Sequence, residues 1–142
     1  MAGSNSWTKA SPYFLSLLRI VTAFLFLCHG ADKLFHLPGG PFTLISSAKL
    51  FTLAPGLAGI LEFGGGLLLL VGLFSRPVAF ILSGEMAFAY FMAHFPANHV
   101  FPYLNGGDNA VLFCFVFLYL SAAGAGPWSL DRLRGRLACP LG

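Results

Sequence analysis

The sequence carries very little charge. Only 9% of its 142 residues are Asp, Glu, Lys or Arg, whereas 57% are hydrophobic and the mean hydropathy is +0.80. A soluble domain has about 25% charged residues. Too few polar side chains are present to cover a water-soluble globule. The shortage of charge therefore excludes an ordinary soluble domain and indicates a protein surrounded by a lipid bilayer.

Several motifs of soluble enzymes are also missing. The cysteines, Cys28, Cys114 and Cys139, are odd in number and form no Cys-x-x-Cys pair, which supports neither a disulfide framework nor a thiol-redox site. The triple glycine at 64–66 lies inside an apolar run, so it is not a phosphate-binding loop, and no Ser–His–Asp spacing stands out. The histidines form no His-x-x-x-His pair, so we expect no metal site.

The basic residues do not form the dense patch that nucleic-acid binding needs. The formal net charge is +3, but Lys and Arg are spread thinly and cluster only near the C-terminus. Basic groups beside membrane helices attract anionic lipid and set the orientation of the chain. The expected partner is therefore the bilayer and not nucleic acid.

Apolar runs separated by turn residues account for most of the chain. A helix that crosses a bilayer needs roughly 20 mostly apolar residues. Four runs approach this length, at about residues 12–30, 54–73, 77–95 and 109–124. The sequence therefore predicts an all-α fold, an integral membrane four-helix bundle that forms a single domain over residues 1–142.

The distribution of Lys and Arg among the connections predicts the orientation. With the N-terminus inside, the inner side carries Lys9, Arg76, Arg132, Arg134 and Arg136. The outer connections carry Lys33 and Lys49. This excess on the inner side, together with an even number of spans, predicts that both termini are cytoplasmic.

Two longer connections fall on the outer side in this topology. In the first, Leu-Pro-Gly-Gly-Pro at 37–41 breaks any helix, and an amphipathic stretch follows as far as Phe51. We expect this stretch to lie in the headgroup region, to dip into the membrane as a lid, or to cover the end of the bundle. The second connection, residues 96–109, is expected to form a polar turn and not a strand.

Three ionisable residues interrupt the apolar runs, namely Arg19, Glu62 and Glu85. An ionisable side chain within a membrane span usually faces a partner, a cavity or a ligand. Depths counted at about 1.5 Å per residue place Arg19 and Glu85 at one level and Glu62 about one turn farther out. We therefore expect Arg19 to pair with Glu85, and Glu62 to lie nearer to a ligand.

One cation and two carboxylates leave a net negative charge, which is costly in a medium of low dielectric constant. One of the two glutamates is therefore expected to hold a proton at neutral pH. Such a group would either exchange its proton with a reducible ligand or donate a hydrogen bond that holds the helices together. The sequence leaves both uses open.

Two further features are candidates for the same site. Gly64, Gly65 and Gly66 follow Phe63 within the second run, and small residues of this kind allow either close helix packing or the approach of a flat ligand. His94 ends the run that carries Glu85 and is a candidate catalytic residue. Its structural alternative is a histidine at the membrane interface that hydrogen-bonds to a loop carbonyl.

The order of these features resembles the DoxX family of small membrane proteins with four spans. The resemblance covers most of the chain, as far as Asp131. Asp108 stands where relatives commonly have Glu, so this carboxylate has a shorter reach here. The resemblance rests on Arg19, Gly30-Ala31-Asp32-Lys33-Leu34, Leu61-Glu62-Phe63-Gly64-Gly65, Leu70-Val71-Gly72-Leu73-Phe74, Arg76, residues 86–94, Asn105-Gly106-Gly107-Asp108 and Gly126-Pro127-Trp128-Ser129-Leu130-Asp131.

The resemblance implies a multi-pass inner-membrane protein that is part of a redox system, in quinone-linked sulfur oxidation or in the response to oxidative stress. The first hypothesis is therefore a subunit of a membrane oxidoreductase with a quinone as cofactor and a soluble or membrane redox partner. The second hypothesis is a non-enzymatic scaffold, or a proton-coupled transporter of small solutes, that uses the same buried charges. In the first hypothesis the catalytic candidates are Glu62, Glu85, Arg19 and His94, and the quinone contacts are Phe63, Gly64, Gly65 and Gly66.

Overall fold

The computed structural model describes residues 6–40, 56–95 and 100–138, and the regular structure in these ranges is entirely helical. The prediction of an all-α fold is confirmed. The amphipathic stretch expected between residues 41 and 51 lies outside the described residues. The helices are α1 (Ser6–Phe35), α2 (Ala58–Val71), α3 (Ser75–Ala89) with a π-helical extension η3 (Tyr90–His94), α4 (Pro102–Asn105), α5 (Asp108–Ala123) and α6 (Leu130–Ala138).

Helix α1 is much longer than the run predicted to end at Gly30. Its 30 residues correspond to about 45 Å of helix, and it continues to Phe35 because the first strong helix breaker is the Pro38-Gly39-Gly40 sequence. Gly30 lies inside the helix, where α2 approaches so closely that an added Cβ would be 2.3 Å from the backbone nitrogen of Phe63. Lys33, predicted in an outer connection, therefore belongs to the last turn of α1.

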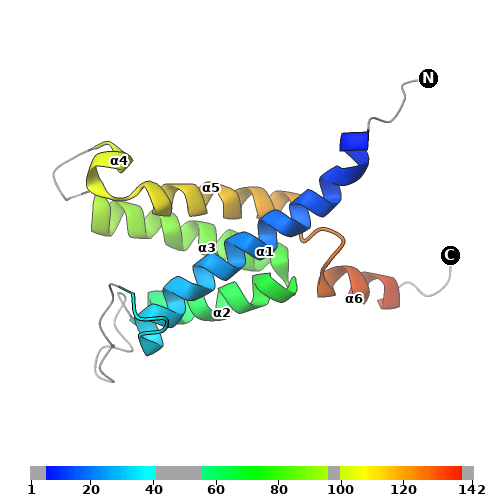
Figure 1. Cartoon of the computed structure of the whole chain (residues 1–142), viewed down its shortest axis with the longest axis horizontal. Coiled ribbons are helices and arrows are strands. Elements are labelled where there is room, and N and C mark those ends of the chain that lie inside the picture. Colours follow the sequence, from blue (N-terminus) through cyan, green and yellow to red (C-terminus); the bar gives the residue numbers. More distant parts are fainter. Residues whose placement is uncertain (1–5, 41–55, 96–99, 139–142) are drawn as a thin grey trace.

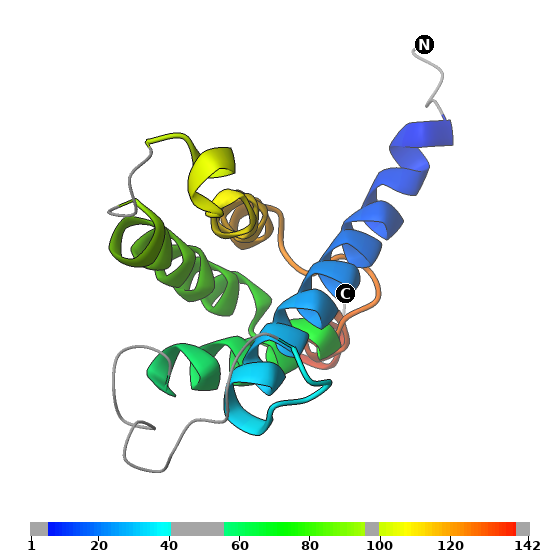
Figure 2. The same ribbon diagram turned by 60° about the vertical axis from the view of Figure 1, so that its left-hand side comes forward.

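The helices pack in two pairs. α1 lies against α2, and α3 lies antiparallel to α5 (Figure 1). Residues 72–74 join α2 to α3. The rotated view in Figure 2 shows that the two helices diverge from this connector. The α1–α2 pair and the α3–α5 pair therefore meet closely at the connector and open toward the other end of the bundle.

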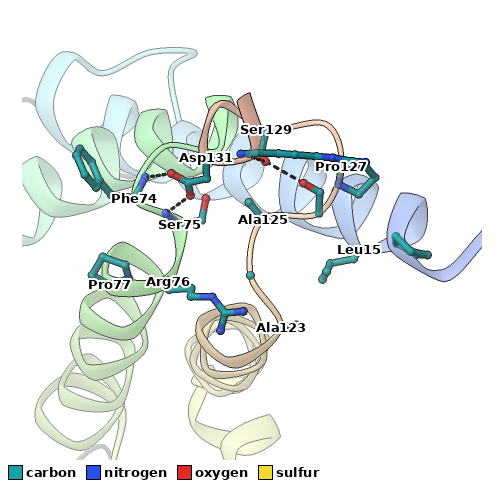
Figure 3. A pocket seen from close by; sticks show the side chains of 14 residues that line it. Leu15, Phe74, Ser75, Arg76, Pro77, Ala123, Ala125, Pro127, Ser129 and Asp131 are labelled. Atoms are coloured by element: carbon teal, nitrogen blue, oxygen red, sulfur yellow. Dashed lines mark hydrogen bonds between the residues drawn. The ribbon is translucent and has the colours of Figure 1, made fainter. Parts of the chain in front are cut away.

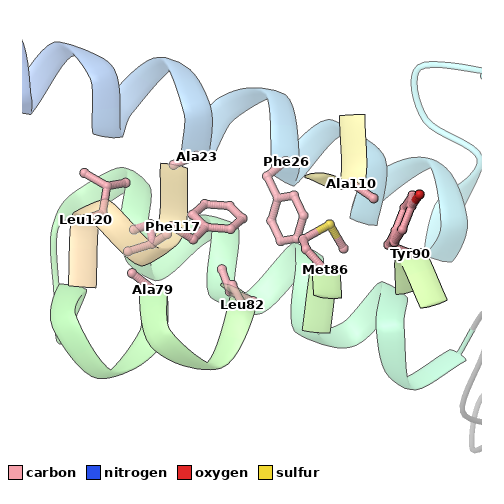
Figure 4. Packing of buried hydrophobic residues seen from close by; sticks show 10 residues of the cluster. Ala23, Phe26, Ala79, Leu82, Met86, Tyr90, Ala110, Phe117 and Leu120 are labelled. Atoms are coloured by element: carbon pink, nitrogen blue, oxygen red, sulfur yellow. The ribbon is translucent and has the colours of Figure 1, made fainter. Parts of the chain in front are cut away.

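The hydrophobic core joins the two pairs. Phe26 of α1 reaches Phe117 of α5, with ring centroids 4.8 Å apart in an edge-to-face arrangement (Figure 4). Around these rings lie other buried residues of α2, α3 and α5, namely Leu69, Ala79, Leu82, Met86, Ala110 and Leu120. Large apolar side chains also cover the outside, including Phe14, Val21, Phe24, Phe80, Phe91, Leu112 and Phe115. An apolar exterior of this kind suits a helix bundle in contact with lipid.

Among the described residues, α1 alone is long and apolar enough to cross a bilayer by itself. α2 and α5 are shorter apolar helices of 14 and 16 residues. α3 and η3 form one continuous helical segment through His94. The number of spans and their orientation remain predictions.

Two segments are more regular than the sequence predicted. The second outer connection contains the short helix α4, which Pro102 begins and Gly106 ends in a left-handed conformation. The basic region after Trp128 forms the helix α6. Asp108 lies exposed in the first turn of α5, where its negative charge interacts favourably with the helix dipole.

Candidate functional site

A buried ion pair connects the end of α1 to the beginning of α2. The Nζ atom of Lys33 lies 2.6 Å from Oε1 of Glu62. Glu62 is only 2% exposed, and its other carboxylate oxygen has no hydrogen-bond partner within the described part of the chain. The prediction that Lys33 lies in an outer loop is wrong, because α1 extends far enough to carry this lysine into the bundle.

Glu85 of α3 lies beside this ion pair. Both of its carboxylate oxygens are buried, and neither makes a hydrogen bond to any described residue. Glu62 and Lys33 are close enough to act electrostatically on Glu85. The structure therefore brings the two predicted glutamates into one cluster with Lys33 as its cation.

The cluster lines a cavity of about 610 Å³ between the first half of α2 and the second half of α3. This volume lies within the range of roughly 300–1,000 Å³ that small-molecule sites occupy. The polar members of the lining are Lys33, Glu62, Glu85 and His94, and the remaining lining residues are Leu57, Ala58, Leu61, Ile81, Gly84, Phe88, Ala89, Met92 and Ala93. The cavity is thus a largely apolar chamber with its ionisable groups gathered together.

His94 closes one end of this chamber. Its Nδ1 atom lies 3.3 Å from the carbonyl oxygen of Asn105 in α4, and its ring stacks against Tyr90. The structure thus contains the loop-carbonyl contact of the structural alternative. The same histidine also lines the large cavity, so both uses of His94 are compatible with its position.

A second, smaller cavity lies on the other side of the Lys33–Glu62 pair. Its volume is about 220 Å³, and it extends toward His29, Asn109 and Phe113. The two cavities share Lys33, Glu62, Ala89 and His94 in their linings. The ion pair is therefore part of the wall between them.

The predicted quinone contacts face in different directions. Gly66 faces α1, where an added Cβ would be 3.0 Å from the backbone nitrogen of Leu27, and Gly65 faces the side chain of Leu82. Gly64 faces open space, and Phe63 packs edge-to-face on Phe35. Close helix packing thus accounts for Gly65 and Gly66. None of these four residues lines the 610 Å³ cavity.

The predicted pairing of Arg19 with Glu85 is wrong. Arg19 is fully buried at the opposite end of the bundle. Among the described residues, its guanidinium donates hydrogen bonds to backbone carbonyl oxygens only, namely those of Leu69, Leu70, Ala125 and Trp128. Depth counting failed because α1 begins at Ser6 and crosses α2 at a different level from the one assumed. Arg19 is thus level with the last turn of α2.

Arg19 belongs to a polar junction that joins α2, α3 and the segment before α6. Figure 3 shows the part of this junction around Phe74, Ser75, Ser129 and Asp131. Asp131 accepts hydrogen bonds of 2.8 Å from the backbone nitrogens of Phe74 and Ser75, at the beginning of α3. Gly72 adopts a left-handed conformation in the connector, and a Cβ there would be 2.5 Å from Cβ of Ser129. The junction therefore fixes the connector between the two helices that line the large cavity.

The environment of Asp131 favours its charged form. Burial opposes ionisation, but the hydrogen bonds from Ser75 and Phe74 and the positive charge of Arg134 outweigh it and lower the pKa of Asp131. Arg76 acts in the same region by donating a hydrogen bond of 3.2 Å to the carbonyl oxygen of Ser121, near the end of α5. Both side chains satisfy backbone groups that helix ends leave unpaired.

Sequence reasoning missed Lys33 as a member of the acid cluster. The signal was present, because Ala31-Asp32-Lys33-Leu34 contains no helix breaker and Pro38 is the first strong one. Within the described ranges, no group of three or more His, Cys, Asp or Glu side chains is arranged to hold a metal ion. What the cluster offers chemically is a buried carboxyl group that can hold or release a proton inside an apolar cavity.

The fold and this cluster define a small helical membrane protein with an acid site inside its bundle. The DoxX family model matches residues 14–95. A Haemophilus influenzae protein described as uncharacterized is 41% identical over 139 residues, covering 89% of this chain and 95% of that protein. The chain therefore belongs to the DoxX family, which confirms the resemblance seen in the sequence. No solved structure matches the chain.

Proposed function

We propose that this protein is a subunit of a quinone-linked redox system, and that the 610 Å³ cavity receives the quinone ring. The observation that carries the proposal is the unpaired state of Glu85, whose two buried oxygens have no partner among the described residues. A buried polar group without a hydrogen bond is costly. A ligand with polar oxygens on an apolar ring would satisfy Glu85 and fill the apolar lining.

The residues of the cavity suit such a ligand. Glu85 is held in its neutral form, because a charged carboxylate without a partner would be costly in this apolar setting. As a neutral acid it donates a hydrogen bond to a ligand oxygen, and it can pass its proton to that oxygen. Lys33 orients the carboxylate of Glu62. A quinone supplies two-electron chemistry coupled to protons, and a partner protein or a reduced substrate is proposed to supply the electrons.

We propose that α1, α2, the α3–η3 segment and α5 each span the inner membrane, with both termini in the cytoplasm. Supporting this orientation, Arg76 and Arg132 line one pocket at the junction, and the guanidinium of Arg134 lies over the ring of Phe74 in the connector. An excess of basic residues marks the cytoplasmic side. The acid cavity then opens in the outer half of the membrane.

Reporter fusions at both termini and labelling of a Gly39→Cys variant test this topology. They should report cytoplasmic ends and an external loop, and the reverse pattern would overturn the topology.

Ligand binding to purified protein tests the proposed function. The wild type in detergent should bind a water-soluble ubiquinone analogue, and Glu85→Leu should bind it about tenfold more weakly, because one hydrogen bond to the ligand is lost. Glu85→Leu removes a buried unpaired group, so it should still fold. The matched control is Phe80→Leu, since Phe80 lies on the same helix, is 65% exposed and does not line the cavity. Equal affinity of all three proteins would count against the proposal.

A second candidate function is proton-coupled transport of a small solute. It is favoured by the position of the Lys33–Glu62 pair between two cavities. An ion pair in this position can separate the part of a solute pathway on one side from the part on the other. In proteoliposomes containing a pH-sensitive dye, a transporter would move protons when solute is added. Solute-driven proton flux that Glu62→Gln abolishes, in a protein that binds no quinone, would replace the redox proposal with this one.

A further inference from the structure

A third cavity continues the acid cavity along the seam between α2 and α3. Its volume is about 230 Å³, and no charged residue lines it. Its lining consists of Ile60, Leu61, Gly64, Gly65, Leu68, Val78, Ile81 and Leu82. Leu61 and Ile81 also line the 610 Å³ cavity, so the two spaces share two walls. The two cavities therefore adjoin along the α2–α3 seam, and we call them together the groove, which is polar at the end with Glu85 and apolar at the other.

Gly64 keeps the apolar part of this groove open. A Cβ built on Gly64 has no neighbouring atom within 4 Å, whereas a Cβ on Gly65 or Gly66 would meet Leu82 or Leu27. Glycine inside a helix is less favourable than alanine. Close helix packing explains Gly65 and Gly66 but not Gly64. The open space above Gly64 instead matches the need for an apolar chain to lie against the bare backbone of α2.

We propose that this groove binds the isoprenoid chain of the molecule whose polar ring occupies the acid cavity. The inference rests on the proposed function and adds the chain as the second part of the ligand. The groove runs from Glu85 toward Leu68 and Val78, that is, from the open end of the α2–α3 pair toward their connector. A membrane lipid in the outer half of a bilayer has the same order, with its polar group outward and its chain toward the centre. The ligand class is therefore a quinone with a prenyl chain and not a bare ring.

Chain-length dependence of binding tests this assignment. The probes are ubiquinone analogues with the same ring and with zero, one or two isoprene units, titrated into purified protein in detergent. Wild-type affinity should rise by about tenfold or more from the chainless probe to the longest one, since each unit buries several apolar carbons. Gly64→Leu fills the groove and should abolish this rise while leaving the affinity for the chainless probe unchanged.

One control and a second blocking variant show that the effect belongs to the groove. Val71→Leu adds one methylene group on an exposed face of the same helix, away from the groove, and should behave as wild type. Ile60→Trp narrows the groove from its exposed rim and provides a second blocking variant if Gly64→Leu fails to fold. Circular dichroism confirms that each variant is helical.

The outcomes separate the two proposals. Wild-type protein that binds the chainless probe through Glu85 but gains nothing from the chain would overturn the groove assignment and leave the proposed function standing. Gly64→Leu that keeps the full chain-length dependence would also overturn it. Wild-type protein that binds no quinone probe would overturn the proposed function and, with it, this inference.

Discussion

The amino group of Lys33 and the carboxylate of Glu62 lie 2.6 Å apart, so the last turn of α1 and the first turns of α2 share one buried ion pair. The same two helices also meet through Gly30, which lies directly against the backbone at Phe63. Close approach and charge pairing therefore occur within about one turn of each other. This arrangement fixes the wall of the acid cavity that α2 provides.

Breaking the ion pair on one side should destabilise the protein. Glu62→Gln removes the carboxylate that lies 2.6 Å from Lys33 inside the bundle, at a cost of about 3 kcal/mol in the free energy of unfolding. Lys33→Met combined with Glu62→Leu should recover most of this loss, because neither buried charge remains. Thermal unfolding in detergent measures both variants. Lys9→Met, an exposed lysine of α1, is the control and should have no effect; a similar loss in the control would refute the argument.

Arg19 should not be replaceable by lysine. Arginine presents five N–H donors in a planar fork, whereas lysine has three donors on one nitrogen and cannot reach four separate carbonyl oxygens. Arg19→Lys should therefore lower the free energy of unfolding by about 2 kcal/mol, whereas Arg132→Lys, on the exposed surface of α6, should change little. Thermal unfolding of the two variants provides the comparison. Equal stability of Arg19→Lys and wild type would show that the carbonyl contacts contribute nothing.

The contribution of Asp131 should depend on pH in a defined direction. Its pKa is lower in the folded protein than the ordinary value of about 3.9. The stabilisation is therefore fully present above the ordinary pKa and is lost as the pH falls through the folded value. Asp131→Ala should be about 1 kcal/mol less stable than wild type at pH 6. Unfolding measured between pH 6 and pH 3 should show this difference narrowing only below about pH 4; a gap that is constant throughout would contradict the assignment.

Two glycines should respond in opposite ways to the same substitution. Gly30→Ala forces a methyl group against the backbone of α2 and should cost about 2–3 kcal/mol. Gly64→Ala meets only open space and should gain about 0.5–1 kcal/mol, because alanine is the better helix former. Thermal unfolding of the two variants, measured in parallel with wild type, shows the sign of each change in stability. The same sign of change in both would mean that α1 and α2 do not cross as described.

Composition and periodicity were sufficient to predict the helical fold. A low charge content and long apolar runs fix the helical class, because a bilayer requires every backbone group to be paired within the chain. The positions of the helices were also predictable, since Gly72, Pro77 and the Asn105-Gly106-Gly107 turn interrupt the apolar runs. The end of α1 was misjudged at Gly30, because glycine in a membrane helix marks close packing as often as a boundary.

The candidate site was only partly predictable. Glu62 and Glu85 fall together as expected, because both lie on the helices on either side of one short connector. Their cation could not be chosen by counting depth along separate helices, since the count depends on where each helix begins and how it crosses its neighbour. The carbonyl partners of Arg19 could not be predicted from the sequence. Every residue has a backbone carbonyl oxygen, so residue types do not show which of these oxygens accepts a hydrogen bond.

The hydrogen bonds of Arg19 keep its positive charge away from the acid cavity. Its guanidinium binds carbonyl oxygens at the far end of the bundle. Among the described lining residues of the cavity, Lys33 is the lysine or arginine, and Glu62 and Glu85 are the carboxyl groups beside it. An anion that enters meets no surplus positive charge from the described residues of the lining and must give up its hydration. We therefore expect the site to favour neutral guests. In a quinone-linked system of the kind proposed, an anionic electron donor must deliver its electrons from outside the helix bundle.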